Sequence, residues 1–180
     1  MKICVFGASS ERISQSYKEC SFELGRVLAE AGHDLVFGGG SRGLMGAVAR
    51  GFKQGGGKVI GIAPKLFDVG DILLKECDEK IITEDMSSRK LRMIEMAEAF
   101  ISLPGGIGTY DELFQVLVEG QLDYHHKPII VYNVNGFYDR LLDMLAYTAE
   151  EGFMRSYEAE LYHVCTAPQE AVRLLEEIRK

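Results

Sequence analysis

Short apolar runs alternate with longer helical patterns along the chain, and this alternation limits the possible fold more than any other feature. Apolar runs of about four to eight residues are typical of strands, whereas apolar residues three and four apart indicate amphipathic helices. The alternation predicts an α/β fold: a doubly wound, mostly parallel sheet of about seven strands with helices on both faces. The expected strands are 2–6, 35–37, 58–62, 80–83, 99–103, 129–132 and 162–165, and the expected helices are 14–31, 43–54, 87–98, 111–122, 136–150 and 168–179.

The composition predicts a single domain over residues 1–180 and excludes several functional classes. The chain has 180 residues and is 47% hydrophobic, which is enough for one core. A net charge of −7 argues against nucleic acid or a membrane surface as a partner. There is no signal-like start or membrane-length apolar run, and the four cysteines and the His125-His126 pair lack metal-site spacing. We therefore expect a cytoplasmic protein without a metal.

A glycine-rich turn at 104–109 lies between an expected strand and an expected helix. Residues 104–112 read Pro-Gly-Gly-Ile-Gly-Thr-Tyr-Asp-Glu. Gly105, Gly106 and Gly108 leave the backbone accessible, and the following helix start presents N–H groups and a positive dipole end. These features favour a phosphate or a carboxylate. A carboxylate beside an anion site, here Glu112, suggests chemistry on a phosphorylated molecule.

A purely structural interpretation of the same residues remains open. Thr109 to Glu112 matches the S/T-x-x-E capping box, in which the glutamate side chain bonds back to the helix start. Asp111 could likewise serve only to stabilise the first turn of that helix.

Two cations occupy the expected first turn of the helix at 87–98. Arg89 and Lys90 oppose the helix dipole there, whether or not Ser87 or Ser88 caps the helix, and an arriving anion would relieve the repulsion. The planar fork of arginine suits phosphate or ribose. The alternative is that both side chains only face solvent. Met86, just before this helix, could face a ligand.

Two other turns, at 7–10 and 38–41, are expected at the ligand-binding edge of the sheet. The spacing of Gly38, Gly40 and Gly43 also fits a dinucleotide fingerprint. It follows the second strand, however, and no acidic residue lies about twenty positions further on, so a tight turn is the better interpretation. The irregular segment 63–79 is either a lid over the site or a surface loop, and the second is favoured.

The motifs together resemble the LOG family of cytokinin riboside 5′-monophosphate phosphoribohydrolases, often labelled lysine decarboxylases. Residues 104–112 match the P-G-G-x-G-T-x-x-E signature, and 86–93 match M-H-x-R-K-x-x-M, with Ser87 in place of the histidine. Val118 and Glu119 also depart from the residues that often precede the family's glutamine, at Gln121 here. These departures bear on base specificity more than on the type of reaction.

The resemblance implies a Rossmann-like homodimer, in some members a higher assembly, that needs no metal or organic cofactor. It implies hydrolysis of the N-glycosidic bond of a purine or N6-modified adenine nucleoside 5′-monophosphate, which yields free base and ribose 5-phosphate. Carried over by position, Arg89 and Glu112 are the catalytic pair. The residues expected to bind the substrate are Ser9, Met86, Lys90, Gly105, Gly106, Ile107, Gly108, Thr109, Tyr110 and Asp111.

Two other functions are compatible with such a chain. One is a nucleotide-binding or cofactor-carrier protein on the same fold, which would bind its ligand without turnover. The other is a decarboxylase dependent on pyridoxal phosphate, which needs a Schiff-base lysine with partners for the pyridine ring. The sequence shows no such arrangement.

Overall fold

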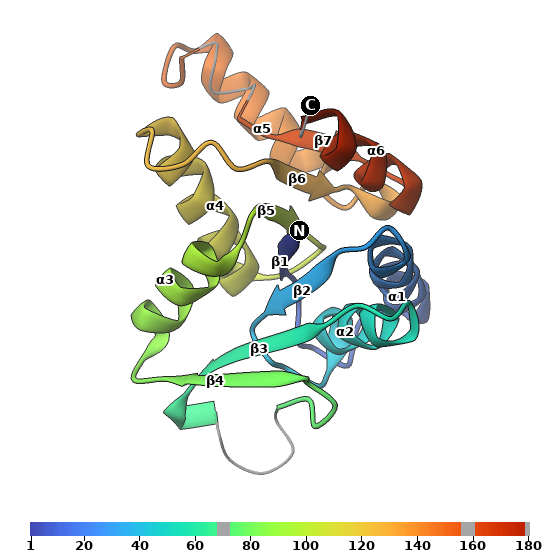
Figure 1. Ribbon diagram of the computed structural model, residues 1–180. Coiled ribbons are helices and arrows are strands. Elements are labelled where there is room, and N and C mark those ends of the chain that lie inside the picture. Colours follow the sequence, from blue (N-terminus) through green and yellow to red (C-terminus); the bar gives the residue numbers. More distant parts are fainter. Residues whose placement is uncertain (68–72, 156–160, 179–180) are drawn as a thin grey trace.

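A parallel sheet of seven strands forms the centre of the molecule in this computed structural model, which describes residues 1–67, 73–155 and 161–178 (Figure 1). The strand order is β4-β3-β2-β1-β5-β6-β7, and every neighbouring pair is parallel. The strands are β1 (Lys2–Phe6), β2 (Asp34–Phe37), β3 (Val59–Pro64), β4 (Glu79–Thr83), β5 (Ala99–Ser102), β6 (Ile129–Tyr132) and β7 (His163–Cys165).

Helices cover both faces of the sheet, so the predicted doubly wound α/β fold is confirmed. Along β1, Ile3 and Val5 point into one core cluster, which includes α1, α2 and α6, and Cys4 and Phe6 point into the other, which includes α3 and α4. The helices are α1 (Gln15–Glu30), α2 (Gly43–Gln54), α3 (Met86–Met96), α4 (Ile107–Gln121), α5 (Asp139–Glu150) and α6 (Pro168–Ile178).

The strand order reverses between β1 and β5, which lie side by side at the middle of the sheet. Without β4, the order corresponds to the Rossmann arrangement 3-2-1-4-5-6. Ligands of such sheets bind beyond the carboxyl ends of the strands at this reversal. The loops after β1 and β5 therefore meet at the position where the sequence predicts a site.

Four helix starts differ from the sequence prediction. Helix α1 begins at Gln15 rather than 14. Helix α4 begins at Ile107 rather than 111, and α3 begins at Met86 rather than 87. Helix α5 begins at Asp139 rather than 136, because Asn135 and Gly136 have positive φ angles and form a short 3-10 turn, η2 (Val134–Gly136). A second 3-10 turn, η1 (Lys65–Phe67), follows β3. Among the described residues, every helix is too short or too polar to span a bilayer.

Candidate active site

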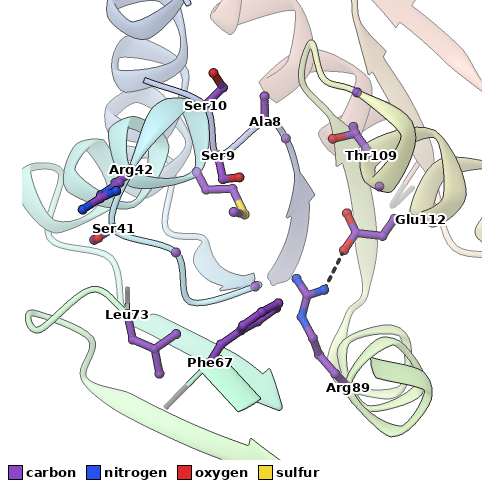
Figure 2. Close-up of a pocket in the computed structure, with 16 residues that line it drawn as sticks. Ala8, Ser9, Ser10, Ser41, Arg42, Phe67, Leu73, Arg89, Thr109 and Glu112 are labelled. Atoms are coloured by element: carbon purple, nitrogen blue, oxygen red, sulfur yellow. Dashed lines mark ion pairs between the residues drawn. The ribbon is translucent and has the colours of Figure 1, made fainter. Parts of the chain in front are cut away.

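A cavity of about 580 Å³ opens at the carboxyl ends of β1, β2, β3 and β5 (Figure 2). Its volume lies within the usual range for small-molecule sites. Three loops, the end of η1, Leu73, the first turns of α2 and α3 and the first two turns of α4 supply its walls. The residues that line it are Gly7, Ala8, Ser9, Ser10, Gly38, Gly40, Ser41, Arg42, Met45, Phe67, Leu73, Arg89, Gly106, Gly108, Thr109 and Glu112.

A buried ion pair lies at one side of this cavity. Arg89 Nη1 is 3.2 Å from Glu112 Oε1, and the two side chains are only 9% and 11% exposed. Figure 2 shows the two groups pointing toward each other from α3 and α4. Burying two charges is costly unless they are paired, so this position in a cavity wall indicates a functional pair. The solvent-facing interpretation of Arg89 is therefore wrong.

The Arg89 guanidinium is held on two further sides. Its Nε donates a hydrogen bond to the carbonyl oxygen of Ile62, in β3, at 3.2 Å. Its Nη2 lies so close to Gly38 that a Cβ built on that glycine would be 1.9 Å away. The glycine after β2 therefore provides the space that the guanidinium occupies.

The N-terminus of α3 is capped by an acidic residue that precedes the helix. Asp85 Oδ1 accepts a hydrogen bond from Ser88 N at 2.8 Å, and Ser88 Oγ accepts one from Asp85 N at 3.1 Å. This capping box places an anion at the end where Arg89 and Lys90 stand. The sequence suggested that a ligand would relieve the repulsion between these two cations and the helix dipole. The Asp85 carboxylate already offsets part of that repulsion.

Glu112 is not part of a capping box. Helix α4 starts at Ile107 with Gly106 as its N-cap, so Thr109 already lies inside the helix and Glu112 lies in its second turn. The capping interpretation is wrong because the helix starts four residues earlier than expected. Burial raises the pKa of the Glu112 carboxyl above its ordinary value, and the Arg89 charge partly offsets this shift.

The amino end of α4 opens into the cavity. Its N-cap has no side-chain hydrogen bond, and its first turn contains no acidic residue. A Cβ built on Gly106 or Gly108 would meet no atom within 4 Å. The helix end therefore offers N–H groups and the positive dipole end to an anion in the cavity.

The amino end of α2, which borders the same cavity, is occupied by protein groups. The carbonyl oxygen of Ala8 accepts hydrogen bonds from Leu44 N at 2.8 Å and Met45 N at 3.3 Å. The Glu11 carboxylate accepts a hydrogen bond from Gly43 N at 2.9 Å. Protein oxygens thus take up donors at this helix end.

The structure brings part of the predicted site together. The predicted residues that line the cavity are Arg89, Glu112, Ser9, Gly106, Gly108 and Thr109. The predicted residues outside its lining are Met86, Lys90, Gly105, Ile107, Tyr110 and Asp111.

The residues outside the lining have other surroundings. Lys90 Nζ is 2.8 Å from Asp111 Oδ2, and Met86 Sδ lies 4.0 Å from Arg89 Nη1. The Ile107 side chain is exposed, and Tyr110 packs against the core on the α4 side. Direct substrate contacts by these residues remain predictions.

The sequence analysis missed the wall opposite α4. Ser41, Arg42 and Met45 lie after β2, where a ligand-facing turn was expected but no contact residue was assigned. Phe67 and Leu73 come from the segment interpreted mainly as a surface loop. The backbone of Leu74 is bonded to Gly39 O at 2.8 Å, which holds this end of the segment at the cavity; residues 68–72 lie outside the described part.

Comparison with known proteins identifies close sequence relatives. A family model described as "Possible lysine decarboxylase" matches residues 45–175. A cytokinin riboside 5′-monophosphate phosphoribohydrolase of Arabidopsis thaliana is 40% identical over 176 residues, which cover 98% of this chain and 81% of the relative. A protein of Oryza sativa subsp. japonica, named as a probable enzyme of the same kind, is 39% identical over 98% of this chain and 72% of its own length.

Solved structures show the same fold at lower identity. The molybdenum cofactor binding protein of Rippkaea orientalis has a TM-score of 0.77 and 21% identity, over 99% of this chain and 97% of that chain. The molybdenum cofactor carrier protein of Chlamydomonas reinhardtii has a TM-score of 0.77 and 23% identity, over 99% and 98% of the two chains. At this identity the likeness concerns the fold alone.

Proposed function

The chain belongs to the LOG family, and on that basis we propose that it hydrolyses the N-glycosidic bond of a nucleoside 5′-monophosphate, releasing free base and ribose 5-phosphate. One observation carries the proposal. The buried Arg89–Glu112 pair lies in the same cavity as the open amino end of α4. An anion site and a carboxylate thus face a single ligand, as cleavage of a phosphorylated nucleoside requires.

The 5′-phosphate binds at the amino end of α4. The backbone N–H groups over Gly106 to Thr109 donate to its oxygens, and the absence of side chains at Gly106 and Gly108 allows close approach. Arg89, already fixed by Ile62 and Gly38, contacts the ribose or the phosphate and balances negative charge. Ser9 faces the ligand from the loop after β1.

Glu112 acts on the sugar. As the bond from C1′ to the base nitrogen breaks, its electron pair leaves with the base and the sugar develops oxocarbenium character. The ionised Glu112 carboxylate stabilises this cation and orients the water whose oxygen bonds to C1′. The water gives up one proton and the departing base takes up one, so the hydrolysis is balanced.

The cavity does not fit decarboxylation with pyridoxal phosphate, which the description of the family model suggests. That cofactor needs a lysine for its Schiff base. None of the described residues that line the cavity is a lysine. Lys90 lies nearby on α3, but its ammonium group pairs with Asp111.

The decisive experiment replaces the carboxylate by its amide. The Glu112→Gln variant is expected to bind AMP, but its kcat is expected to be about 10²–10³-fold lower, because a well-placed electrostatic group is removed. Glu95→Gln is the matched control, since Glu95 is an exposed carboxylate on α3 that pairs with Arg92 and lies outside the cavity. Free base and ribose 5-phosphate are measured by chromatography over a panel of purine and N6-modified adenine monophosphates.

Two results would contradict the proposed reaction. Wild-type turnover in Glu112→Gln would show that the carboxylate has only a structural role. Tight nucleotide binding by the wild type without release of ribose 5-phosphate would establish the carrier function instead.

We also propose that the chain acts as a homodimer. Helix α5 has no buried residue, and apolar side chains on α4, α5 and the turns after them are exposed. These exposed side chains are Val118, Leu122, Tyr124, Met144, Tyr147 and Phe153. Association of two copies of the chain would cover these side chains.

Light scattering tests this proposal. It is expected to give the dimer mass for the wild type and the monomer mass for a Met144→Arg, Tyr147→Arg variant. A monomeric wild type would contradict the proposal.

The remaining proposals concern domain organisation and compartment. Residues 1–180 act as one domain, which is supported by a cavity built from both halves of a single sheet. The cytoplasm is the proposed compartment. All four cysteines of the sequence lie within the described residues and are free, as suits a reducing environment.

A further inference from the structure

A buried tyrosine lies behind the phosphate-binding loop. Tyr138 follows the η2 turn and is fully buried. Its hydroxyl donates a hydrogen bond to the carbonyl oxygen of Leu103 at 2.6 Å. Because a phenol has one proton, the Ser102 hydroxyl at 2.9 Å is the donor in the second hydrogen bond. Tyr138 thus binds the chain where β5 ends and the loop begins.

The N–H of Leu103 still donates to Phe6 O, in β1, at 2.9 Å, and the loop leaves the hydrogen-bond ladder of the sheet after this bond. Strand β5 ends at Ser102, and Pro104 has no N–H to donate. Two hydrogen bonds hold the carbonyl groups ahead of Gly105: Leu103 O accepts from Tyr138, and Pro104 O accepts from Ala8 N at 3.2 Å. Together with the bond from Leu103 N to Phe6 O, these two bonds orient the backbone that leads into the glycines.

Tyr138 also contacts the far end of the same loop. Its ring packs edge-on against Tyr110, in the first turn of α4, with the ring centroids 6.3 Å apart. One side chain therefore touches both the strand that enters the loop and the helix that leaves it.

Tyr138 is itself held firmly. Its backbone N–H donates to Asn133 Oδ1 at 2.7 Å, and Asn133 Nδ2 donates to Asp139 Oδ1 at 2.7 Å. The backbone N–H of Asn133 bonds to Cys165 O, in β7, at 2.8 Å. The outer strands of the sheet thus fix the position of the tyrosine.

We propose that Tyr138 is a positioning residue for phosphate recognition: it holds the 104–109 loop so that the amides at the start of α4 face the 5′-phosphate. Tyr138 does not line the cavity and does not touch the substrate. It acts through the backbone of Leu103 and the ring of Tyr110. The inference deepens the proposed function and rests on it.

The test compares ligands with and without the phosphate. In Tyr138→Phe, calorimetry is expected to show that the affinity for AMP falls about tenfold. The reason is that displaced backbone amides of the 104–109 loop lose charge-assisted hydrogen bonds to the phosphate. Adenosine affinity is expected to stay within about twofold, since adenosine lacks the phosphate. The phosphate is held in both ground and transition states, so KM for AMP rises more than kcat falls.

Matched variants separate positioning from general damage. Tyr132→Phe is the control, because Tyr132 is equally buried but belongs to the core cluster on the opposite face of the sheet. It is expected to leave both affinities unchanged. Ser102→Ala removes only the second hydrogen bond of Tyr138, and a smaller loss is expected, again selective for AMP. If Tyr138→Phe does not fold, Ser102→Ala decides the question.

The outcomes are distinct from those for the proposed function. Unchanged AMP affinity, or an equal loss for AMP and adenosine, overturns the positioning role. A wild type that binds AMP but releases no ribose 5-phosphate overturns the hydrolase function. The positioning role of Tyr138 is then still decided by comparing the affinities for AMP and adenosine. A wild type that binds none of the nucleoside 5′-monophosphates of the panel overturns both.

Discussion

Two glycine-rich loops border the cavity, one after β2 and one after β5, and they differ in what lies next to their glycines. In the loop after β2, a Cβ on Gly38 would collide with Arg89 at 1.9 Å, and one on Gly43 would collide with Ala8 O at 2.5 Å. In the loop after β5, a Cβ on Gly106 or Gly108 would meet no atom within 4 Å. The first loop is glycine-rich because protein fills the space. In the second loop, Gly105 makes room for the Thr109 side chain, contrary to the expectation that it leaves the backbone accessible, and only Gly106 and Gly108 have open space beside them.

The helices that follow these loops differ in the same way. The N-caps of α2 and α4 both lack a side-chain hydrogen bond, but at α2 Ala8 and Glu11 accept hydrogen bonds from the first N–H groups. Among the described residues, no protein group accepts a hydrogen bond from the first three N–H groups of α4. A glycine turn before a helix therefore does not by itself identify an anion site. The site is identified by whether protein acceptors already occupy the helix end.

Among the variants that test this comparison of the two loops, the largest effect is expected when α4 is given a carboxylate at its amino end, as α2 has in Glu11. Gly106→Asp places an acid at the N-cap position, where Gly106 has extended backbone geometry and open space around it. AMP affinity is expected to fall about a hundredfold, because the carboxylate takes the amides and repels the phosphate. Stability should rise by a few tenths of a kcal/mol. Calorimetry and thermal unfolding measure the two effects.

The neutral variant Gly106→Asn is the control for that experiment. Asparagine fills similar space without a charge. The loss of AMP affinity in Gly106→Asn is therefore expected to be smaller than in Gly106→Asp. Wild-type affinity in Gly106→Asp would show that the phosphate binds elsewhere.

A smaller effect is expected from Gly38→Ala in the first loop. The new methyl group would displace the Arg89 guanidinium from Glu112, so kcat/KM for AMP should fall about ten- to a hundredfold. Gly120→Ala is the control, because a Cβ there makes ordinary contacts at 3.5 Å or more and lies outside the cavity. Unchanged kinetics in Gly38→Ala would mean that Arg89 need not hold this position.

The smallest effect is a shift in pH dependence. Hydrogen bonds to Lys18 and to Gly43 N hold the pKa of Glu11 below its ordinary value, whereas burial raises the pKa of Glu112. Because Glu112 is proposed to act as a carboxylate, kcat/KM should fall as the pH drops through this raised pKa, at a higher pH than for an ordinary glutamate.

Two charge variants check this assignment. The Asp111 charge raises the pKa of Glu112 and the Lys90 charge lowers it. Asp111→Asn should therefore move the acid limb of the pH–rate profile to lower pH, and Lys90→Gln should move it to higher pH. Shifts in the same direction, or none, would contradict the assignment of this limb to Glu112.

The alternation of apolar runs and helical patterns was sufficient to predict the fold and the edge of the sheet at which the cavity lies. Each strand and helix carries its own local periodicity, and parallel strands joined by crossover helices place their carboxyl ends together. The motif at 104–112 indicated the anion site for the same reason, because a strand, a glycine turn and a helix start are all local features.

The tertiary structure alone decided how these parts meet. Whether Glu112 caps its own helix or pairs with Arg89 depends on where α4 begins and on how α3 packs beside it. Phe67 reaches the cavity, and Tyr138 reaches Leu103, across contacts between segments distant in the chain. Local periodicity determines which element a residue belongs to, but the surroundings of a side chain come from packing between elements, and no single stretch of sequence encodes that packing.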